Sequence, residues 1–422
     1  MRRCTLMVAV GLSILGGCGG GSGAGSAPSQ LTVAAFNPFS GADADFGPEM
    51  MGGCIPAVRL INQSGGPLGH QMSCMTVDTR GDPADAVPAA SKMLATTSNL
   101  VGVLGPSADE AQATVPLIDT AKIPMFADTG EAAFDHSQYT YFYRLTPADD
   151  VKGYALAQWA HNKGYTRAAA VFGSDIGAQS DVPTLVRAFQ KLGGTIVSNQ
   201  KIALDQSSYR TEVEQMVAAN PQVIFTEADP QTSATFFSEL KQLHGLIPVI
   251  GTETSRQAAW LKAVQGAVGA SDFTKYFVGM QPYAPTSGAA WKTYDKGLLA
   301  SASSVPKPEQ WASDPYSMTY YDGVNLIALA IIAANSTKPE TFAPQIVKLT
   351  QNRPGAVTVY SFKQGKDALA AGKTIRYVGA GGPIAFDRWH NSAGAFEAAS
   401  YANGNVKIVG TVSAAQIAAL SR

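Results

Sequence analysis

Short apolar runs alternate with longer amphipathic stretches along most of the chain. The apolar runs have the length and β-branched content of strands buried on both faces. The expected strands are 31–36, 71–78, 101–104, 124–127, 168–172, 195–201, 223–227 and the run ending at Gly251. The expected helices are 48–62, 83–96, 110–121, 150–163, 182–192, 209–219 and 230–243. Strands that alternate with helices in this way predict an α/β fold with mostly parallel sheets.

The loops after these strands are the expected ligand-binding positions, because open parallel sheets bind ligands beyond the carboxyl ends of their strands. Several of the loops combine small residues with a polar or acidic one, as a pocket of backbone amides and a few side chains requires. The same polar residues are good helix N-caps, and the two interpretations are compatible. These loops are 37–47, 105–109, 127–131, 173–179, 228–231 and 251–255.

The N-terminus carries an export signal. Arg2 and Arg3 form a positive region, 6–15 is apolar but too short to span a bilayer, and Leu-Gly-Gly-Cys ends at Cys18. That ending resembles the lipobox of bacterial lipoproteins. It predicts removal of the signal peptide 1–17 and lipidation of Cys18, which would hold the protein on a membrane surface. The alternative is an ordinary secretory signal that happens to contain this cysteine. The following Gly/Ser-rich residues, 18–30, predict a flexible tether.

Composition excludes some classes of function. The formal net charge is −1 with 15% charged residues, so no basic surplus is present to attract nucleic acid. After the signal, no second stretch of 18 apolar residues predicts a membrane span. The length is typical of two domains.

Cys54 and Cys74 are the two cysteines outside the signal. In an exported chain, one such pair most simply forms a disulfide, which would close a loop of about 20 residues and stabilise the fold by roughly 3 kcal/mol. Two separate buried thiols are the alternative, because spacing alone does not exclude them.

Several catalytic and metal-binding motifs are absent from the sequence. It contains no phosphate-binding Gly-x-x-x-x-Gly-Lys-Ser/Thr, no Gly-x-Ser-x-Gly between a strand and a helix, and no His-Glu-x-x-His. No nucleophile stands in a pattern with a base. We therefore expect no enzymatic activity, no metal and no cofactor.

An ordered set of short motifs resembles the type I periplasmic binding proteins of the leucine/isoleucine/valine-binding class. The motifs are Ser40-Gly41, Phe46-Gly47, Ala57-Val58, Ile61-Asn62, Gly65–Gly69, Asp78-Thr79, Gly81–Pro83, Gly102–Pro106, Ile123–Met125, Tyr320–Gly323 and Gly379–Asp387. The resemblance implies two Rossmann-like lobes with parallel sheets, joined by a three-segment hinge that closes around a small ligand. It places one lobe at 31–147 plus 283–383 and the other at 148–282 plus 384–422.

The resemblance also implies ligand contacts on the first lobe. Phe46 and Tyr316 match aromatic residues that pack near the ligand. The family holds the ligand carboxylate with hydroxyl groups and backbone amides after the third and fourth strands. Here Ser107 or Asp109 stands at the first hydroxyl position, and the second loop contains Thr129 and Glu131. Glu131 takes the place of a Thr, and an acid there would repel a ligand carboxylate.

On the second lobe, Ile176 replaces a family aromatic residue, and Asp229 falls near the position of a family Tyr. Glu253 matches the acid that accepts hydrogen bonds from the ligand ammonium group, so it is the expected polar contact. The resulting surplus of acids favours a ligand with an extra amine, or an amide or polyol donor.

The implied function is an extracytoplasmic solute-binding receptor of an ABC importer, for an amino acid of branched-chain type or a related amine or amide. Its expected partners are this ligand, the permease subunits and, through the lipid anchor, the membrane. The alternative is a ligand-sensing lipoprotein that acts on a membrane signalling partner.

Overall fold

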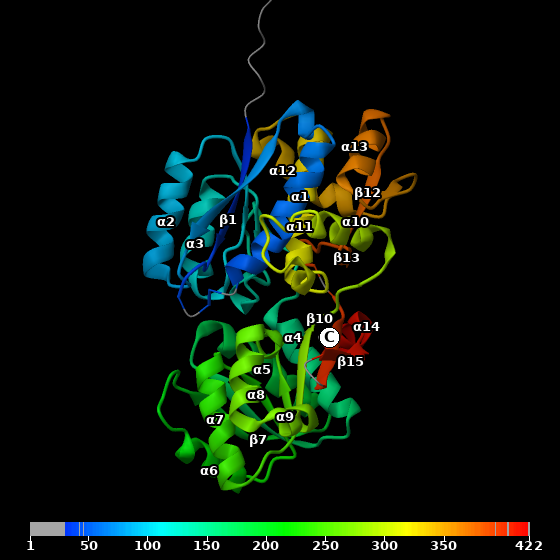
Figure 1. Ribbon diagram of the computed structural model, residues 1–422. Helices are drawn as coiled ribbons and strands as arrows, with labels where there is room; N and C mark the ends of the chain where they lie inside the picture. The colour runs from blue at the N-terminus through cyan, green and yellow to red at the C-terminus, as the bar shows by residue number, and fades with distance from the viewer. Residues whose placement is uncertain (1–29, 42, 45, 393, 403–404, 421–422) are drawn as a thin grey trace, which may run out of the picture.

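The structure is a computed structural model that describes residues 30–41, 43–44, 46–392, 394–402 and 405–420. The expected signal peptide, lipidated Cys18 and the tether up to residue 29 lie outside the described residues. Two α/β lobes stack on each other, and the chain passes between them more than once (Figure 1). The sequence-predicted fold class is confirmed.

The first lobe is built on a parallel sheet with the strand order β2-β1-β3-β4-β5. Its strands are β1 Leu31–Asn37, β2 Met72–Asp78, β3 Leu100–Leu104, β4 Met125–Ala127 and β5 Phe142–Arg144. The helices between them are α1 Phe46–Gln63, α2 Pro83–Thr96 and α3 Ala108–Thr120, with short 3₁₀ turns at Pro67–Gly69 and Ala132–Phe134. Alternate residues of β1 belong to the two cores on the opposite faces of this sheet: Val33 and Ala35 on one, Ala34 and Phe36 on the other.

A later part of the chain returns to this lobe. It contributes α10 Gly288–Leu299, a 3₁₀ turn at Pro308–Trp311, α11 Pro315–Ala334, α12 Pro339–Thr350, β11 Val357–Val359, α13 Phe362–Ala370, β12 Ile375–Gly379 and β13 Gly382–Pro383. By length and composition α11 could cross a membrane, but 78% of its apolar window is buried inside the protein. It packs against α1, where Gly53 allows close approach: a Cβ there would lie 2.3 Å from the Ser317 carbonyl oxygen.

The second lobe has a seven-stranded sheet in the order β15-β14-β10-β9-β8-β6-β7. Its parallel strands are β6 Arg167–Gly173, β7 Thr195–Ile202, β8 Val223–Glu227, β9 Val249–Gly251 and β10 Phe277–Pro282. The antiparallel pair β14 Phe396–Ala402 and β15 Asn405–Val412 extends it at one edge. The surrounding helices are α4 Asp149–Asn162, α5 Ile176–Lys191, α6 Arg210–Ala218, α7 Pro230–Leu243, α8 Ala258–Val268, α9 Ala270–Tyr276 and α14 Ala414–Leu420, with a 3₁₀ turn at Glu253–Arg256.

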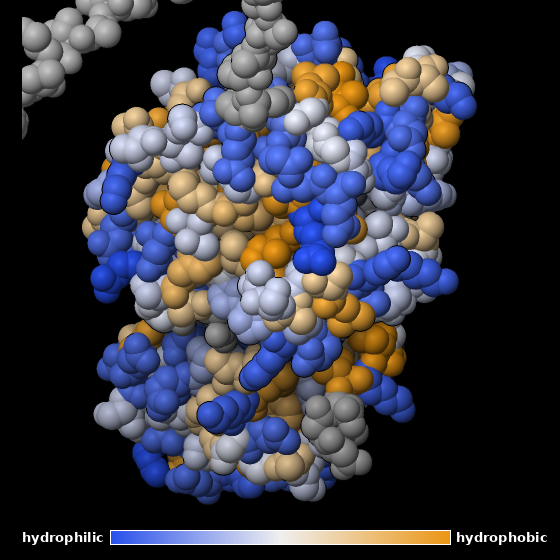
Figure 2. Space-filling model, turned by 45° about the horizontal axis from the view of Figure 1, so that its top comes forward, coloured by the Kyte–Doolittle hydropathy of each residue, from blue (hydrophilic) through white to orange (hydrophobic). Residues whose placement is uncertain are grey.

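The disulfide expected between Cys54 on α1 and Cys74 on β2 is present, with Cα atoms 6.2 Å apart. It fastens the first helix to an edge strand of the first sheet. On the face in Figure 2, hydrophilic residues cover most of the surface and exposed hydrophobic residues form separate patches.

Candidate functional site

A cleft of about 360 Å³ lies between the two lobes, at the carboxyl ends of strands from both sheets. On the first lobe the lining follows β1, β2, β3 and β4, and on the second it follows β6, β7, β8 and β9. This is the position that the sequence predicts for a ligand in open parallel sheets. The lining residues are Asp43, Phe46, Arg80, Gly81, Asp82, Ser107, Asp109, Asp128, Gly130, Asp149, Lys152, Asp175, Gly177, Leu204, Glu227, Ala228, Asp229, Pro230, Glu253, Thr254, Gln257, Ala259 and Tyr316.

Most of the sequence-predicted ligand contacts come together in this cleft. Phe46 and Tyr316, from the starts of α1 and α11, provide apolar surface. Four predicted polar residues also line it: Ser107, Asp109, Asp229 and Glu253. Asp109 reaches toward the other lobe, where the backbone amides of Gly177 and Ile176 oppose the rise in its pKa that burial causes.

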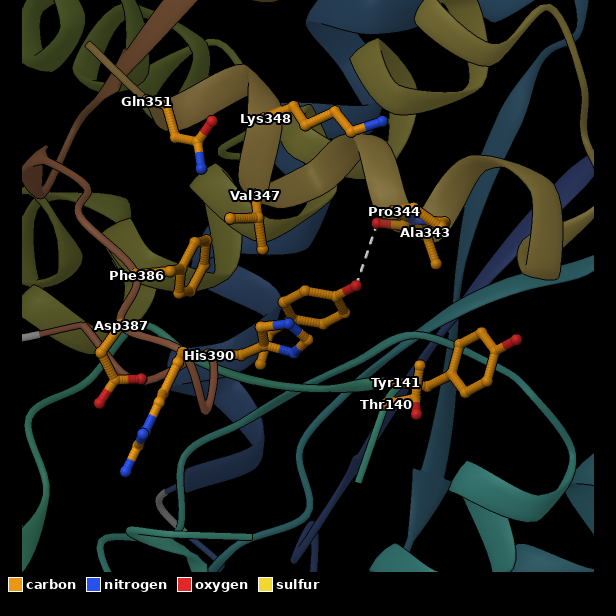
Figure 3. Close-up of a pocket in the computed structure, with 12 residues that line it drawn as sticks. Thr140, Tyr141, Ala343, Pro344, Val347, Lys348, Gln351, Phe386, Asp387 and His390 are labelled. Atoms are coloured by element: carbon orange, nitrogen blue, oxygen red, sulfur yellow. Dashed lines mark hydrogen bonds between the residues drawn. The ribbon is translucent and has the colours of Figure 1, made fainter. Parts of the chain in front are cut away.

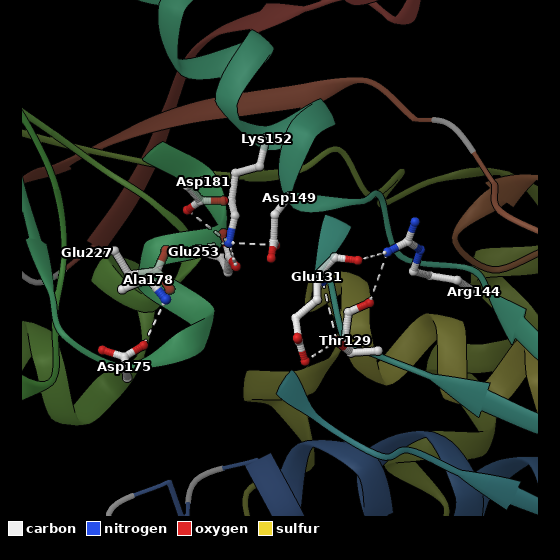
Figure 4. A network of polar contacts seen from close by, with 10 residues as sticks. All are labelled: Thr129, Glu131, Arg144, Asp149, Lys152, Asp175, Ala178, Asp181, Glu227 and Glu253. Carbon is white, nitrogen blue, oxygen red and sulfur yellow. Dashed lines mark hydrogen bonds and ion pairs between the residues drawn. The ribbon is translucent and has the colours of Figure 1, made fainter. Parts of the chain in front are cut away.

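The other three predicted contacts do not line the cleft. Ile176 is the first residue of α5 and its side chain is exposed, while the backbone of Gly177 faces the cleft instead. Thr129 and Glu131 are buried, and Glu131 accepts hydrogen bonds from the Thr129 hydroxyl and from Gln112. Their carbonyl oxygens accept from the Arg144 guanidinium at 3.4 and 3.2 Å (Figure 4). Thr129 and Glu131 do not face the cleft because their loop supplies hydrogen-bond acceptors to the buried Arg144.

Arg144 ends β5 and is fully buried. Besides the two carbonyl oxygens, its guanidinium contacts the carboxylate of Asp135 and donates to the side-chain amide oxygen of Asn391 at 2.9 Å. Its backbone also pairs with the chain at Asn391, in a parallel bridge. Arg144 therefore joins the segment that leaves the first sheet to the segment that leads to β14.

Lys152, on α4, is the main residue of the cleft that sequence reasoning missed. Its ammonium group lies 2.8 Å from Glu253, 3.2 Å from Asp181, 3.3 Å from Asp149 and 3.4 Å from Glu227 (Figure 4). Asp149, one helical turn away, was the only local signal. The other three carboxylates come from α5, the end of β8 and the turn after β9, so only the tertiary fold brings them to Lys152.

Burial and mutual repulsion shift the titration of the cleft carboxyl groups. Burial raises the pKa of Asp149 and of Asp128 to about 7, against the lowering effects of Lys152 on the first and of the Tyr320 hydroxyl on the second. Burial, together with Asp175, Glu110 and Asp229, raises the pKa of Asp43 to about 6. Burial alone would lower the pKa of Lys152, but its four carboxylate neighbours raise it well above its usual range. Lys152 is therefore a permanent cation at neutral pH.

A second hollow, of about 530 Å³, lies beside α12, between the first lobe and the segment 386–390 (Figure 3). Its floor is aromatic: Tyr143 stacks on His390 with ring centroids 4.6 Å apart, and Phe386 meets Tyr143 edge-on. The Tyr143 hydroxyl donates to the Ala343 carbonyl oxygen at 3.0 Å. Although it is larger, this hollow takes no residue from the second lobe's parallel strands, so the inter-lobe cleft is the better candidate for a ligand that both lobes contact. Among the described residues, no group of three or more His, Cys, Asp or Glu is placed to hold a metal ion.

A family profile for periplasmic binding proteins matches residues 30–409. No curated protein matches the chain in sequence. The structure of a leucine-binding protein from Thermotoga maritima has a TM-score of 0.72 at 17% identity, over 91% of this chain and 99% of that one. A branched-chain amino acid transporter substrate-binding protein from Streptococcus pneumoniae, in complex with isoleucine, has a TM-score of 0.71 at 16% identity, over 91% and 99%.

A solute-binding protein of an ABC transporter from R. palustris, in complex with benzoate, has a TM-score of 0.69 at 16% identity, over 91% of this chain and 96% of that one. At such identities these likenesses concern the fold, while the family profile covers most of the chain. The chain therefore belongs to the periplasmic binding protein family, a family of extracytoplasmic solute-binding proteins, and has its type I fold.

Proposed function

We propose that this protein is the solute-binding receptor of an ABC importer and that it takes a small polar ligand into the cleft between its lobes. The observation that carries the proposal is the cleft itself, to which both lobes contribute charged side chains, backbone and apolar surface. The ligand class is an amino acid or a related amine or amide. Structurally similar proteins were solved with isoleucine and with benzoate, so the fold alone does not select among small ligands.

The proposed contacts are the predicted residues that line the cleft. Phe46 and Tyr316 pack against the carbon skeleton, whereas Ser107, Asp109, Asp229 and Glu253 meet polar groups. The proposed anchor is the acylated Cys18, on the outer face of the membrane or its periplasmic side, with 18–30 as the tether.

The lobe boundaries are part of the same proposal: 31–147 plus 283–383, and 148–282 plus 384–422. The memberships of the two large sheets support them. If these are the moving bodies, a saturating ligand should reduce the radius of gyration in small-angle X-ray scattering. An unchanged radius on saturation would contradict the closure.

Calorimetric titration with amino acids, amines and amides tests the function. Phe46→Ala should weaken binding of the ligand so found by about tenfold or more, because an apolar side chain in contact is worth roughly 1.5–3 kcal/mol. Phe386→Ala is the matched control, since Phe386 lies in the other hollow. An equal loss of ligand affinity in Phe46→Ala and Phe386→Ala would contradict the assignment of the ligand to the cleft.

A second measurement separates import from sensing. Reconstituted with its permease and ATPase subunits, the receptor should raise ATP hydrolysis only when ligand is present. If ligand instead changes only the activity of a membrane kinase, the sensing alternative holds.

A further inference from the structure

The cleft carries a large surplus of negative side chains. Its described lining has two cationic side chains, Arg80 and Lys152, against nine carboxylic ones. The carboxylic residues are Asp43, Asp82, Asp109, Asp128, Asp149, Asp175, Glu227, Asp229 and Glu253. Even with some of them protonated, the electrostatic potential in this partly enclosed space favours a cation.

Neither cation offers a ligand carboxylate a strong, desolvated partner. The Lys152 ammonium already has four carboxylates within 3.4 Å. Arg80 pairs with Asp85 at 3.3 Å and is largely exposed to solvent, where such a pair is weak. An incoming carboxylate would therefore meet no desolvated positive partner among the described side chains.

Three of the helix starts at the cleft, those of α2, α5 and α7, are occupied as well. A helix N-terminus attracts anions through its free backbone N–H groups, and at these three helices internal carboxylates already accept from them. Asp82 accepts from Ala84 on α2, Asp175 from Ala178 on α5, and Asp229 from Gln231 and Thr232 on α7, at 2.7 to 3.0 Å. On α3, Glu110 accepts from the hydroxyl and the N–H of Ser107. Helices α4 and α8 have no side-chain cap, and α4 begins at the acidic Asp149.

Two carboxylate oxygens of the cleft residues are left without a donor. Oε2 of Glu253 and Oδ2 of Asp229 are buried and accept no hydrogen bond from any described residue. Each belongs to a side chain whose other oxygen is used, by Lys152 and by the start of α7 respectively. A buried acceptor without a donor is costly, so each oxygen favours an N–H group from a ligand.

We propose that the cleft selects a small organic cation without a carboxylate, an amine or amidine. Its N–H groups donate to Glu253 and Asp229, and its carbon skeleton packs on Phe46 and Tyr316. The inference rests on the proposed receptor function and names its ligand class. It separates this protein from structurally similar ones whose ligands carry a carboxylate, such as isoleucine and benzoate.

Pairs of ligands that differ only by a carboxylate test the inference on the full chain. The probes are 3-methylbutylamine with leucine, 1,4-diaminobutane with ornithine, and agmatine with arginine, measured by titration calorimetry at pH 7.5. In at least one pair the amine should bind at least about tenfold more tightly, and in none should the amino acid bind more tightly. The ligand class is overturned if an amino acid binds as tightly as its amine, or if no probe binds.

Asp229→Asn sharpens the test, because Asn keeps the cap of α7 while the negative charge is removed. It should weaken binding of the amine about tenfold or more and reduce the difference in affinity between the amine and its paired amino acid. The control is Asp272→Asn, which removes one charge from an exposed ion pair with Lys241 on the same lobe and should change neither affinity. Equal affinities of wild type and Asp229→Asn for the amine would overturn the assigned contact.

The two levels of the proposal fail differently. Amino acid binding that is stronger than amine binding and still stimulates the permease ATPase overturns the ligand class and leaves the receptor function intact. If an amine binds but does not change the rate of ATP hydrolysis by the permease complex, the receptor function is overturned and the ligand class is left intact.

Discussion

Two buried cations, Arg144 and Lys152, are only eight positions apart in the sequence, yet their surroundings differ. The Arg144 guanidinium contacts one carboxylate and three neutral oxygens, so its cluster is close to electrically neutral. The Lys152 ammonium faces four carboxylates, which leaves a surplus of negative charge beside the cleft. The first arrangement is complete without a ligand. The second is satisfied fully only by protons or by a further cation, and this difference separates a structural cluster from the cluster that we propose to bind a ligand.

Replacing Lys152 should have the largest effect. Lys152→Met leaves four carboxylates without their cation, and removing one partner of a buried charge cluster costs about 3–5 kcal/mol. We expect a loss in the upper part of this range at pH 8, measured by urea unfolding. At pH 5 the loss should shrink, because burial raises the pKa of Asp149, Asp181 and Glu253 and they take up protons.

Lys163→Met on the same helix is the control, since its ammonium lies over the Trp159 ring and has no carboxylate partner among the described residues. It should change stability by about 0.5 kcal/mol or less. A loss in Lys152→Met that is the same at both pH values would contradict the charge surplus.

Arg144→Met should come next, in the lower part of about 3–5 kcal/mol, because its carboxylate partner Asp135 keeps 18% of its side chain exposed. Burial raises the pKa of Asp135 and Arg144 lowers it, so acid should relieve part of the loss in the same unfolding assay at pH 5 and pH 8, but less than in Lys152→Met because this cluster contains a single carboxylate. A strong rescue by acid would show that the two cations do not differ as described.

Removing the disulfide gives a reference destabilisation that involves neither Arg144 nor Lys152. Cys54→Ser/Cys74→Ser should cost about 2–4 kcal/mol, the value for a closed loop of this length. Thermal unfolding under non-reducing conditions measures it, and ligand affinity at 20 °C should stay unchanged. A changed affinity would mean that this destabilisation of the first lobe itself affects the cleft, and the cation variants would have to be judged against it.

The wild-type protein should show a further effect that needs no substitution, a dependence of stability on pH without ligand. Burial raises the pKa of Asp128 and Asp149 to about 7 in the folded state, above the unfolded value near 4. The stabilising contribution of their protons is therefore complete below about pH 4 and is lost as pH rises through 7. Between pH 5 and pH 8 the unfolding free energy should fall by at least about 1.4 kcal/mol, the equivalent of one pKa unit. Greater stability at pH 8 in urea titrations would contradict this.

Most of the fold could be predicted from the sequence, because strands that are buried on both faces form recognisable apolar runs. The runs at β6 and β8 are apolar on both faces, and their predicted bounds agree with the structure to within one residue. Helix α5 begins six residues before its predicted start at 182, since Asp175 caps it and Pro183 is accommodated inside the helix. The β14–β15 pair was not predicted individually.

The candidate site could be predicted less completely, because some of its residues depend on partners that are distant in the sequence. Side chains that directly follow a strand, such as Ser107 and Asp229, could be placed at the cleft by topology alone. Lys152 lies inside a helix, 29 positions from Asp181 and 101 from Glu253, so no local pattern indicates its partners. The same holds for Glu131, whose role depends on the distant pairing of Arg144 with Asn391.

The pairing at Arg144 also has a mechanical consequence. Its N–H donates to the His390 carbonyl oxygen and its carbonyl accepts from the Ser392 N–H, at 3.0 and 2.9 Å. Two segments that connect the lobes are thus joined by backbone hydrogen bonds. The third connection, after β10, is joined to them as well, because the Tyr283 N–H donates to the Ala395 carbonyl oxygen at 2.8 Å. Three independent connections would permit the lobes to twist and slide, whereas three connections that are hydrogen-bonded to one another restrict relative motion mainly to one rotation. If the lobes close as proposed, every closure should therefore follow the same path.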